Sequence, residues 1–312
     1  MTITDADRMT LVNRWVQTSS PTEQDRMERA ERMIVNAIDS HKPFDGYRDS
    51  FRVYAKGSYA NQTNVRLDSD VDIVVESHHS YFDDFLTPQI KQAATPDPGW
   101  SAYEGPWVPA TWRIEVGTAL KNYFGASEVD TSGEVAIVVK EKEGSRPSTD
   151  VVPAFKFIRY DSSDRTRKVQ GSKVFKKTAG ALINYPAQQL ANGNDKNSRW
   201  RTNGRYKQFA RALKNGENAL VDAGLMRAKP SYFMECLAYN VPDNDLTQGT
   251  DTSAWFRWAL ATVHNRLQPD EYDSEGWVEP NELKYLFHPD QKWRVEDGRE
   301  LTRKLWDYLE YE

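Results

Sequence analysis

Residues 68–76 read DSDVDIVVE, and this stretch constrains the fold more than any other part of the chain. From residue 70 onward it is rich in β-branched residues, which predicts a β-strand. Successive side chains of a strand point to opposite faces, so Asp70 and Asp72 share one face and lie roughly 6.5–7 Å apart at Cα. The other face is apolar and consists of Val71, Ile73 and Val75. The strand can therefore bury one face and present paired carboxylates on the other.

Paired carboxylates at this spacing repel each other unless a cation lies between them. Oxygen ligands favour Mg²⁺ or Mn²⁺, and two such ions about 4 Å apart can activate a hydroxyl and stabilise a leaving phosphate. A lone Asp-x-Asp is most often solvated surface. The interpretation as a site for two metal ions therefore needs support from the rest of the sequence.

A Gly57-Ser58 pair follows a predicted strand at 51–57 and supplies part of that support. Glycine lets the backbone approach a ligand closely, and N–H groups of such a turn can cradle a phosphate, to which Ser58 adds a hydroxyl donor. Gly-Ser turns are common by themselves. The order of strand, Gly-Ser, eleven residues and Asp-apolar-Asp-apolar is far more specific.

This order resembles the nucleotidyltransferase signature of the DNA polymerase β-like superfamily, which requires an apolar residue between the two acids. Asp70-Val71-Asp72 satisfies the pattern, whereas Asp68 is followed by Ser69 and is interpreted as a solvated or supporting acid. The superfamily has a third carboxylate on a neighbouring strand. Asp150, which opens the predicted strand at 149–160, matches it.

The remaining periodicity predicts an α+β fold. Helices are expected at 19–40 and 109–125, a strand at 134–142, a hairpin at 171–185, and mostly loop at 79–108. After residue 185 the pattern becomes helical, with helices at 204–224, 230–241, 252–267 and 298–312. We therefore expect a nucleotidyltransferase sheet core with its N-terminal helix in 1–185 and a helical nucleotide-binding lobe in 186–312. The active site is expected in the cleft between the two lobes.

Two segments of the helical half, residues 184–220 with RYKQFARALK and residues 228–242 with PSYF, resemble the bacterial cGAS/DncV-like nucleotidyltransferases, or CD-NTases. The resemblance covers most of the chain, roughly residues 20–245. In that group a lysine on a bundle helix and a serine at the start of the next helix hold the donor triphosphate. Lys207 and Ser231 match these places, and Lys214 is the alternative lysine. Tyr232 matches a tyrosine that stacks on a nucleobase in some members. The alternative interpretations are a surface cation for Lys207, a simple helix cap for Ser231 and a packing residue for Tyr232.

The resemblance implies a Mg²⁺-dependent, template-independent nucleotidyltransferase that makes a cyclic di- or trinucleotide signal in antiphage defence. Asp70, Asp72 and Asp150 would hold two Mg²⁺ or Mn²⁺ ions. NTPs would be the substrates and a linear dinucleotide the intermediate, and the resemblance leaves room for regulatory partner proteins. Other acceptors are an RNA 3′ end, a small molecule or a protein, and an inactive binding module is a third hypothesis.

Composition limits the partners further. The chain has 312 residues and a net charge of −5, which argues against duplex DNA as a partner because phosphate contacts need clustered Lys and Arg. A single cysteine, Cys236, excludes an internal disulfide and a Cys-rich zinc site, and His78 and His79 are expected in a loop. No apolar run or secretory signal is present, so no membrane association and a cytoplasmic location are expected. P-loop, Rossmann and zincin motifs are missing from the sequence.

Overall fold

The computed structural model describes residues 3–18, 20–65, 70–97, 101–269, 276–289 and 291–311. The chain divides into two compact units. Residues 21–59 and 68–186 form the sheet unit, and residues 1–20, 60–67 and 187–312 form the helical unit. The division at Pro186 lies beside the expected boundary. Residues 1–20 and 60–67, however, group with the helical unit and not with the sheet core in which we placed them.

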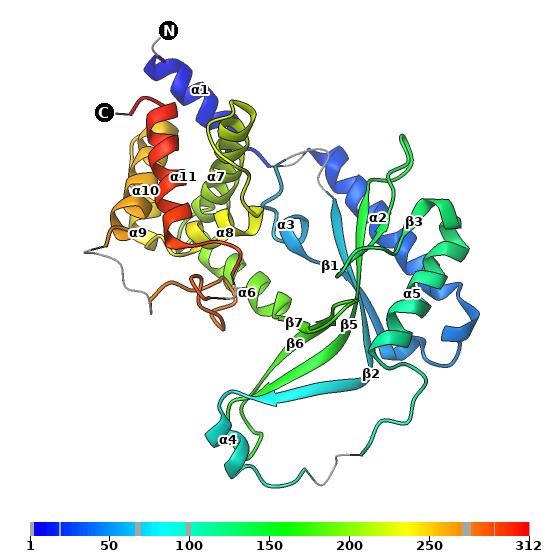
Figure 1. Cartoon of the computed structure of the whole chain (residues 1–312). Coiled ribbons are helices and arrows are strands. Elements are labelled where there is room, and N and C mark those ends of the chain that lie inside the picture. The colour runs from blue at the N-terminus through cyan, green and yellow to red at the C-terminus, as the bar shows by residue number, and fades with distance from the viewer. Residues whose placement is uncertain are drawn as a thin grey trace. The chain divides into compact units, whose positions relative to one another are not determined.

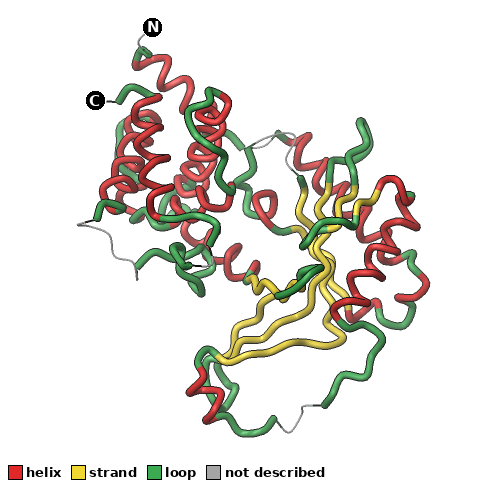
Figure 2. Tube along the Cα trace, viewed as in Figure 1, coloured by secondary structure: helices red, strands yellow, loops and turns green. Residues whose placement is uncertain are grey.

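The sheet unit is built on a mixed sheet whose described strands follow the order β1-β2-β5-β4-β3, with β6 paired to β5 and β7 to β6. The strands are β1 Phe51–Ala55, β2 Val71–Phe85, β3 Val129–Asp130, β4 Ile137–Val139, β5 Thr149–Tyr160, β6 Lys168–Phe175 and β7 Ala181–Asn184. β2 and β5 are parallel, and the other strand pairs of the described residues are antiparallel. Figure 2 shows these strands in yellow. The predicted strands and the hairpin are confirmed.

The expectation of loop at 79–108 is wrong for its first part, because β2 continues to Phe85 and α4 spans Pro88–Ala93. Residues 81–85 pair with β5 after a register shift between Ser77 and Tyr81. Tyr81, Phe82 and Phe85 have strong β preference, which favours the continued pairing. His78 and His79 therefore lie in a strand and not in a loop.

Helices α2 (Pro21–Asp39) and α5 (Pro109–Phe124) cover one face of the sheet (Figure 1). Their apolar residues pack against the apolar face of β2 and the start of β5. This core includes Ile34, Ile38, Trp112, Val116, Leu120, Val71, Ile73, Val75 and Val151. Because these valines and isoleucines of β2 face the helices, Asp72 lies on the opposite face of the sheet.

The helical unit contains the C-terminal helices together with the first helix of the chain. They are α1 Asp5–Trp15, α6 Pro186–Lys196, α7 Arg205–Asp222, α8 Ser231–Tyr239, α9 Asp243–Leu246, α10 Thr252–Arg266 and α11 Val295–Tyr308. Val12 and Trp15 of α1 are buried in the same core as Phe209 of α7 and Leu305 of α11, which is why residues 1–20 belong to this unit. The predicted C-terminal helices are confirmed.

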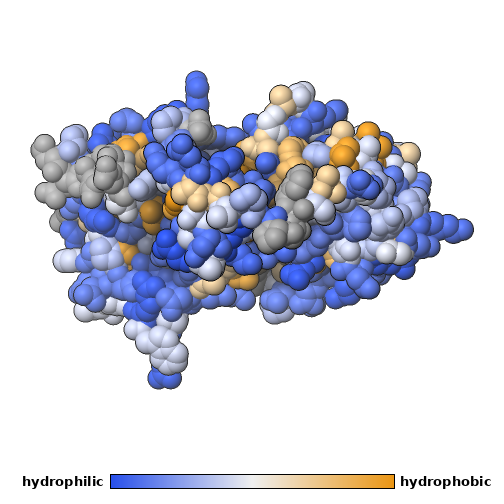
Figure 3. Space-filling model, turned by 90° about the horizontal axis from the view of Figure 1, so that it is seen from below, coloured by the Kyte–Doolittle hydropathy of each residue, from blue (hydrophilic) through white to orange (hydrophobic). Residues whose placement is uncertain are grey.

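The face drawn in Figure 3 is mostly hydrophilic, with apolar areas of limited size between charged side chains. No helix among the described residues has the length and apolar character needed to cross a membrane.

Candidate active site

The candidate site begins where β2 and β5 begin. Asp72 and Asp150 are register partners on these adjacent parallel strands, and Val71 pairs with Thr149. Neighbouring strands are about 4.8 Å apart, so the two carboxylates project side by side from the same face. Asp70 immediately precedes β2. The structure thus places Asp72 beside Asp150 and Asp70 at the entrance to β2. Asp68 lies outside the described residues.

The electrostatics of the three acids show that negative charge is concentrated here. Burial raises the pKa of Asp150 to about 6, with further contributions from Asp70 and Asp72, while Lys56 opposes the shift. Burial also raises the pKa of Asp72, Lys56 opposes this effect, and Asp70 adds to it. The three aspartates therefore carry more negative charge than Lys56 balances.

Lys56 is a residue that the sequence interpretation missed. Its Nζ lies 4.0 Å from Oδ1 of Asp72, and its backbone N–H donates a 2.9 Å hydrogen bond to the carbonyl oxygen of Asp72. The available signal was its position directly before the Gly-Ser pair at the end of a predicted strand.

Gly57 lies against Asp72 for a steric reason. Its φ is +72°, a left-handed conformation that side chains disfavour, and a Cβ added there would lie 2.5 Å from Oδ2 of Asp72. Gly57 and Ser58 begin the single helical turn α3, Gly57–Ala60, and Tyr59 of that turn is buried. The predicted phosphate turn is thus next to a predicted metal ligand, and the missing side chain is what allows this approach.

The donor set suits a hard divalent cation. Among the described residues, no group of three or more His, Cys, Asp or Glu side chains lies in an arrangement that could hold a metal ion. Burial and the neighbouring aspartates nevertheless raise the pKa of Asp72 and of Asp150, and carboxylate oxygens are the ligands that Mg²⁺ and Mn²⁺ prefer. The concentration of negative charge therefore fits a hard divalent cation.

A polar cluster lies further along the same face of β2 and was also missed. Glu76 is 3% exposed, accepts a 3.0 Å hydrogen bond from the Tyr54 hydroxyl, and lies 2.5 Å from Nε2 of His78. Val74 and Val152 separate this cluster from the aspartates along the strands. The sequence past residue 76 shows no regular alternation of polar and apolar residues, which is why a loop was expected there.

The remaining predicted residues belong to the helical unit. Lys207 is 6% exposed, and its Nζ donates a 2.7 Å hydrogen bond to Oδ1 of Asn194. Burial lowers the pKa of Lys207, and Glu235 opposes the shift. Ser231 is the exposed first residue of α8. Tyr232 donates a 3.3 Å hydrogen bond to Oε2 of Glu279, and burial raises the pKa of its hydroxyl.

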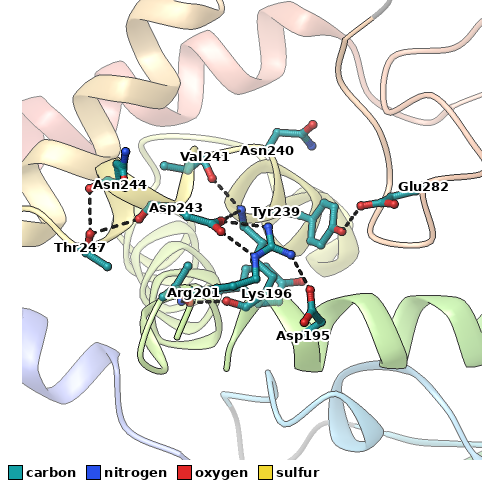
Figure 4. Close-up of polar contacts among 12 residues, drawn as sticks. Asp195, Lys196, Arg201, Tyr239, Asn240, Val241, Asp243, Asn244, Thr247 and Glu282 are labelled. Carbon is teal, nitrogen blue, oxygen red and sulfur yellow. Dashed lines mark hydrogen bonds and ion pairs between the residues drawn. The ribbon is translucent and has the colours of Figure 1, made fainter. Parts of the chain in front are cut away.

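The surroundings of Lys207 are fixed by the charged network drawn in Figure 4. Lys196, at the end of α6, donates hydrogen bonds of 2.8 Å to the carbonyl of Val241 and to Oδ1 of Asp243. Arg201 bridges Asp243 and Asp195. Asn194 accepts a hydrogen bond from the side chain of Lys207, and Asn197 accepts one from its backbone N–H. Both asparagines lie on the segment that this network holds in place.

The sheet is mixed, and two helices cover one of its faces. Three aspartates lie at the starts of two neighbouring strands, and a Gly-Ser turn lies against one of them. This combination defines a nucleotidyltransferase of the DNA polymerase β-like class. The family model of the cGAS/DncV-like nucleotidyltransferase C-terminal helical domain matches residues 191–310. The chain is 33% identical over 300 residues to the cyclic dipyrimidine nucleotide synthase CdnE of Legionella pneumophila, covering 95% of this chain and 96% of that protein. It belongs to the cGAS/DncV-like nucleotidyltransferase family.

Two solved structures resemble this one closely. The Rhodothermus marinus CdnE c-UMP-AMP synthase with Apcpp and Upnpp has a TM-score of 0.78 at 28% identity and covers 96% of this chain and 95% of that chain. The Elizabethkingia meningoseptica CdnE cyclic dinucleotide synthase with GTP and Apcpp has a TM-score of 0.76 at 26% identity and covers 97% of this chain and 99% of that chain.

Proposed function

We propose that this chain joins NTPs, with release of pyrophosphate, into a cyclic di- or trinucleotide that serves as a second messenger in antiphage defence. The observation that carries the proposal is the register of Asp72 and Asp150 on parallel β2 and β5, with Gly57 against Asp72. Relatives that match nearly the whole chain are named cyclic nucleotide synthases, which supports the cyclic product.

In the proposed reaction, a ribose hydroxyl of one nucleotide attacks the α-phosphorus of an NTP. The new O–P bond forms as the bond to pyrophosphate breaks, and Asp150 takes the hydroxyl proton. Asp150 is suited to that role because it is the register partner of Asp72 at the proposed reaction site. Bound Mg²⁺ or Mn²⁺ at Asp70, Asp72 and Asp150 would neutralise the charge that develops on the phosphates.

The chain's other candidate residues bind and orient the nucleotide. Gly57 and Ser58 present backbone N–H groups and a hydroxyl to the triphosphate, and Lys56 adds a positive charge beside Asp72. Lys207 and Ser231 contribute a point charge and a helix N-terminus toward the same phosphates. Tyr232 offers a flat face to a base. Positioning and charge stabilisation supply most of the acceleration in phosphoryl-type transfers.

A second acceptor class keeps the same chemistry. An RNA 3′ end, a small molecule or a protein side chain could replace the second nucleotide. RNA tailing favours a basic groove, and the net charge of −5 does not favour it.

Incubation of the purified protein with all four NTPs and Mg²⁺ tests the proposal. Mass spectrometry should detect a product with the mass of a cyclic di- or trinucleotide that resists phosphatase, together with stoichiometric pyrophosphate. The Asp70→Asn/Asp72→Asn double variant is the matched control and should release none. Pyrophosphate release that requires added RNA or another acceptor would favour the second class instead.

A further inference from the structure

Residues 60–65 connect the two halves of the candidate site and yet belong to the helical unit. Gly57-Ser58 lies just before them in the chain, and Asp70 and Asp72 follow a few residues after them. Asn61 is 7% exposed, Thr63 0% and Asn64 3%, so this polar segment is buried. Burial of polar groups is costly unless each finds a partner. The hydrogen-bond partners of this segment therefore identify the groups that hold it in place.

Lys214 of α7 devotes its ammonium group to this segment. Its Nζ lies 3.0 Å from the carbonyl oxygen of Thr63, 3.1 Å from Oγ1 of Thr63, and 3.5 Å from Oε2 of Glu235. An ammonium has three N–H donors, and three acceptors surround it here. Lys214 is 3% exposed. These internal contacts explain its burial without a phosphate ligand.

The carboxylate of Glu235 in α8 is likewise surrounded by hydrogen-bond partners. Its Oε2 accepts a 2.6 Å hydrogen bond from the Thr63 hydroxyl, and its Oε1 accepts from Asn61 at 3.3 Å and from Gln189 of α6 at 2.9 Å. With Lys214, four groups surround the carboxylate, which has about four lone-pair sites. Thr63 is thus both donor to Glu235 and acceptor from Lys214.

Arg211, one turn before Lys214 on α7, holds the neighbouring residue. Its Nη1 donates a 2.8 Å hydrogen bond to the carbonyl oxygen of Gln62, and its Nε donates to the carbonyl oxygen of Val16. Gln62 has a φ of +56°, a conformation that a residue with a side chain adopts at a cost. The hydrogen-bonded partners on both sides of Gln62 compensate for that cost.

We infer that Lys214, Glu235 and Arg211 form a clamp that holds residues 61–63 on α6, α7 and α8, and that this clamp positions the adjoining Gly57-Ser58 turn for catalysis. Lys214 is accordingly a positioning residue that touches no substrate. The catalytic part of this inference rests on the proposed function, whereas the clamp itself can be measured without nucleotide. A buried polar cluster of this kind gives conformational specificity at the expense of stability.

Thr63→Val tests the clamp, because it removes the hydroxyl while nearly preserving side-chain volume. Thr63→Ser restores the hydroxyl. Thr302→Val is the matched control, since Thr302 is 1% exposed, lies on α11 of the same unit, and donates to the carbonyl oxygens of Gly298 and Arg299. Amide hydrogen exchange of peptides that cover residues 57–65 is compared for the four proteins without nucleotide. kcat and KM for NTPs are then measured.

In Thr63→Val we expect the amides of these peptides to exchange at least about ten-fold faster than in the wild type, and kcat to fall about ten-fold. The reason is that the buried hydrogen bonds of the Thr63 hydroxyl with Glu235 and Lys214 are lost. Thr63→Ser should return both values to within about two-fold. Thr302→Val should lower the melting temperature but leave both values unchanged.

If the amides of these peptides exchanged at the wild-type rate in Thr63→Val, the clamp would be overturned. Faster exchange with an unchanged kcat would overturn its positioning role. If the wild type makes no product from any NTP, the proposed function fails, and the exchange comparison still decides whether the clamp exists.

Discussion

Asp72 and Asp150, which are 78 positions apart in the sequence, are direct register partners on the parallel strands β2 and β5. Parallel strands need a crossover connection, and the long segment between these two residues, which contains helix α5, supplies it. The pairing brings carboxylates to one sheet face while the helices cover the other face. Several measurable consequences depend on this relationship.

Asp150→Asn should lower the rate of pyrophosphate release at least about 10³-fold, because the amide neither accepts the hydroxyl proton nor balances a divalent cation. Asn has nearly the same shape, so the circular dichroism spectrum should not change. Asp164→Asn, in the turn after β5, is the control and should retain wild-type activity. Comparable activity in Asp150→Asn would remove Asp150 from the site.

The raised pKa of Asp150 predicts a pH-dependent stability of the metal-free protein. An unfolded Asp titrates near about 3.9, and burial together with Asp70 and Asp72 raises the folded value to about 6. The protonated form is therefore favoured by folding. This contribution is full below about pH 4 and is lost as the pH rises through about 6.

In EDTA, the free energy of unfolding of the wild type should therefore fall relative to that of Asp150→Asn between pH 4 and pH 7. The difference should be about 1 kcal/mol after allowance for solvent screening. Urea denaturation at several pH values measures it. Added Mg²⁺ should stabilise the wild type at pH 7 more than it stabilises the variant, while a pH-independent difference would contradict the assigned shift.

Gly57→Ala should remove activity through a steric clash. The new Cβ would lie 2.5 Å from Oδ2 of Asp72 and force that carboxylate to move. Gly46→Ala is the matched control, because Gly46 has a φ of +83° in the same unit and has no neighbouring atom within 4 Å of the added Cβ. Both variants should lose about 1 kcal/mol of stability from the left-handed backbone.

Only Gly57→Ala should also lose Mg²⁺-dependent pyrophosphate release, by about 10²-fold or more, since displacement of a reacting group by about 1 Å costs that much. Equal activities in the two alanine variants would show that the contact with Asp72 has no catalytic consequence.

Lys207→Met and Lys214→Met should have different effects although both lysines lie on α7. Lys214→Met leaves the buried Glu235 carboxylate without its cation and should destabilise the fold by about 3–5 kcal/mol. Lys207 donates to a neutral Asn194 side chain, so its loss should cost about 1 kcal/mol.

Lys207→Met should instead raise KM for NTPs about ten-fold, as expected when a charge-assisted contact to phosphate is lost. Thermal unfolding and steady-state kinetics on the same samples distinguish the two effects. An unchanged KM in Lys207→Met would assign that lysine to structure alone.

Tyr232→Phe and Tyr232→Leu separate the two uses of the tyrosine. Phe keeps the ring and loses the hydrogen bond to Glu279, so it should leave KM unchanged and cost about 1 kcal/mol of stability. Leu also removes the aromatic face and should raise KM about ten-fold, in line with about 1–3 kcal/mol for stacking on a base. Equal KM values for Phe and Leu would exclude stacking.

Local patterns predicted much of the fold. The alternation at 70–76, the helical periodicity after residue 185 and the Gly-Ser pair each depend on a few neighbouring residues, and the corresponding elements are present. The continuation of β2 to Phe85 was missed because its pairing with β5 depends on residues more than 70 positions away. Pro and Gly later in the same region favoured an interpretation as loop.

The residues of the candidate site also fall into two groups, those that the sequence identified and those that only the structure revealed. The sequence by itself determined which acids could act together, because a strand period of two places Asp70 and Asp72 on one face whatever the rest of the chain does. Only the tertiary structure decided that Lys56 lies beside Asp72, that Gly57 must lack a side chain, and that Lys214 and not Lys207 is bound to Thr63 and Glu235. Those facts depend on strand pairing and helix packing, in which residues far apart in the chain meet, and no local pattern of side chains encodes such distances.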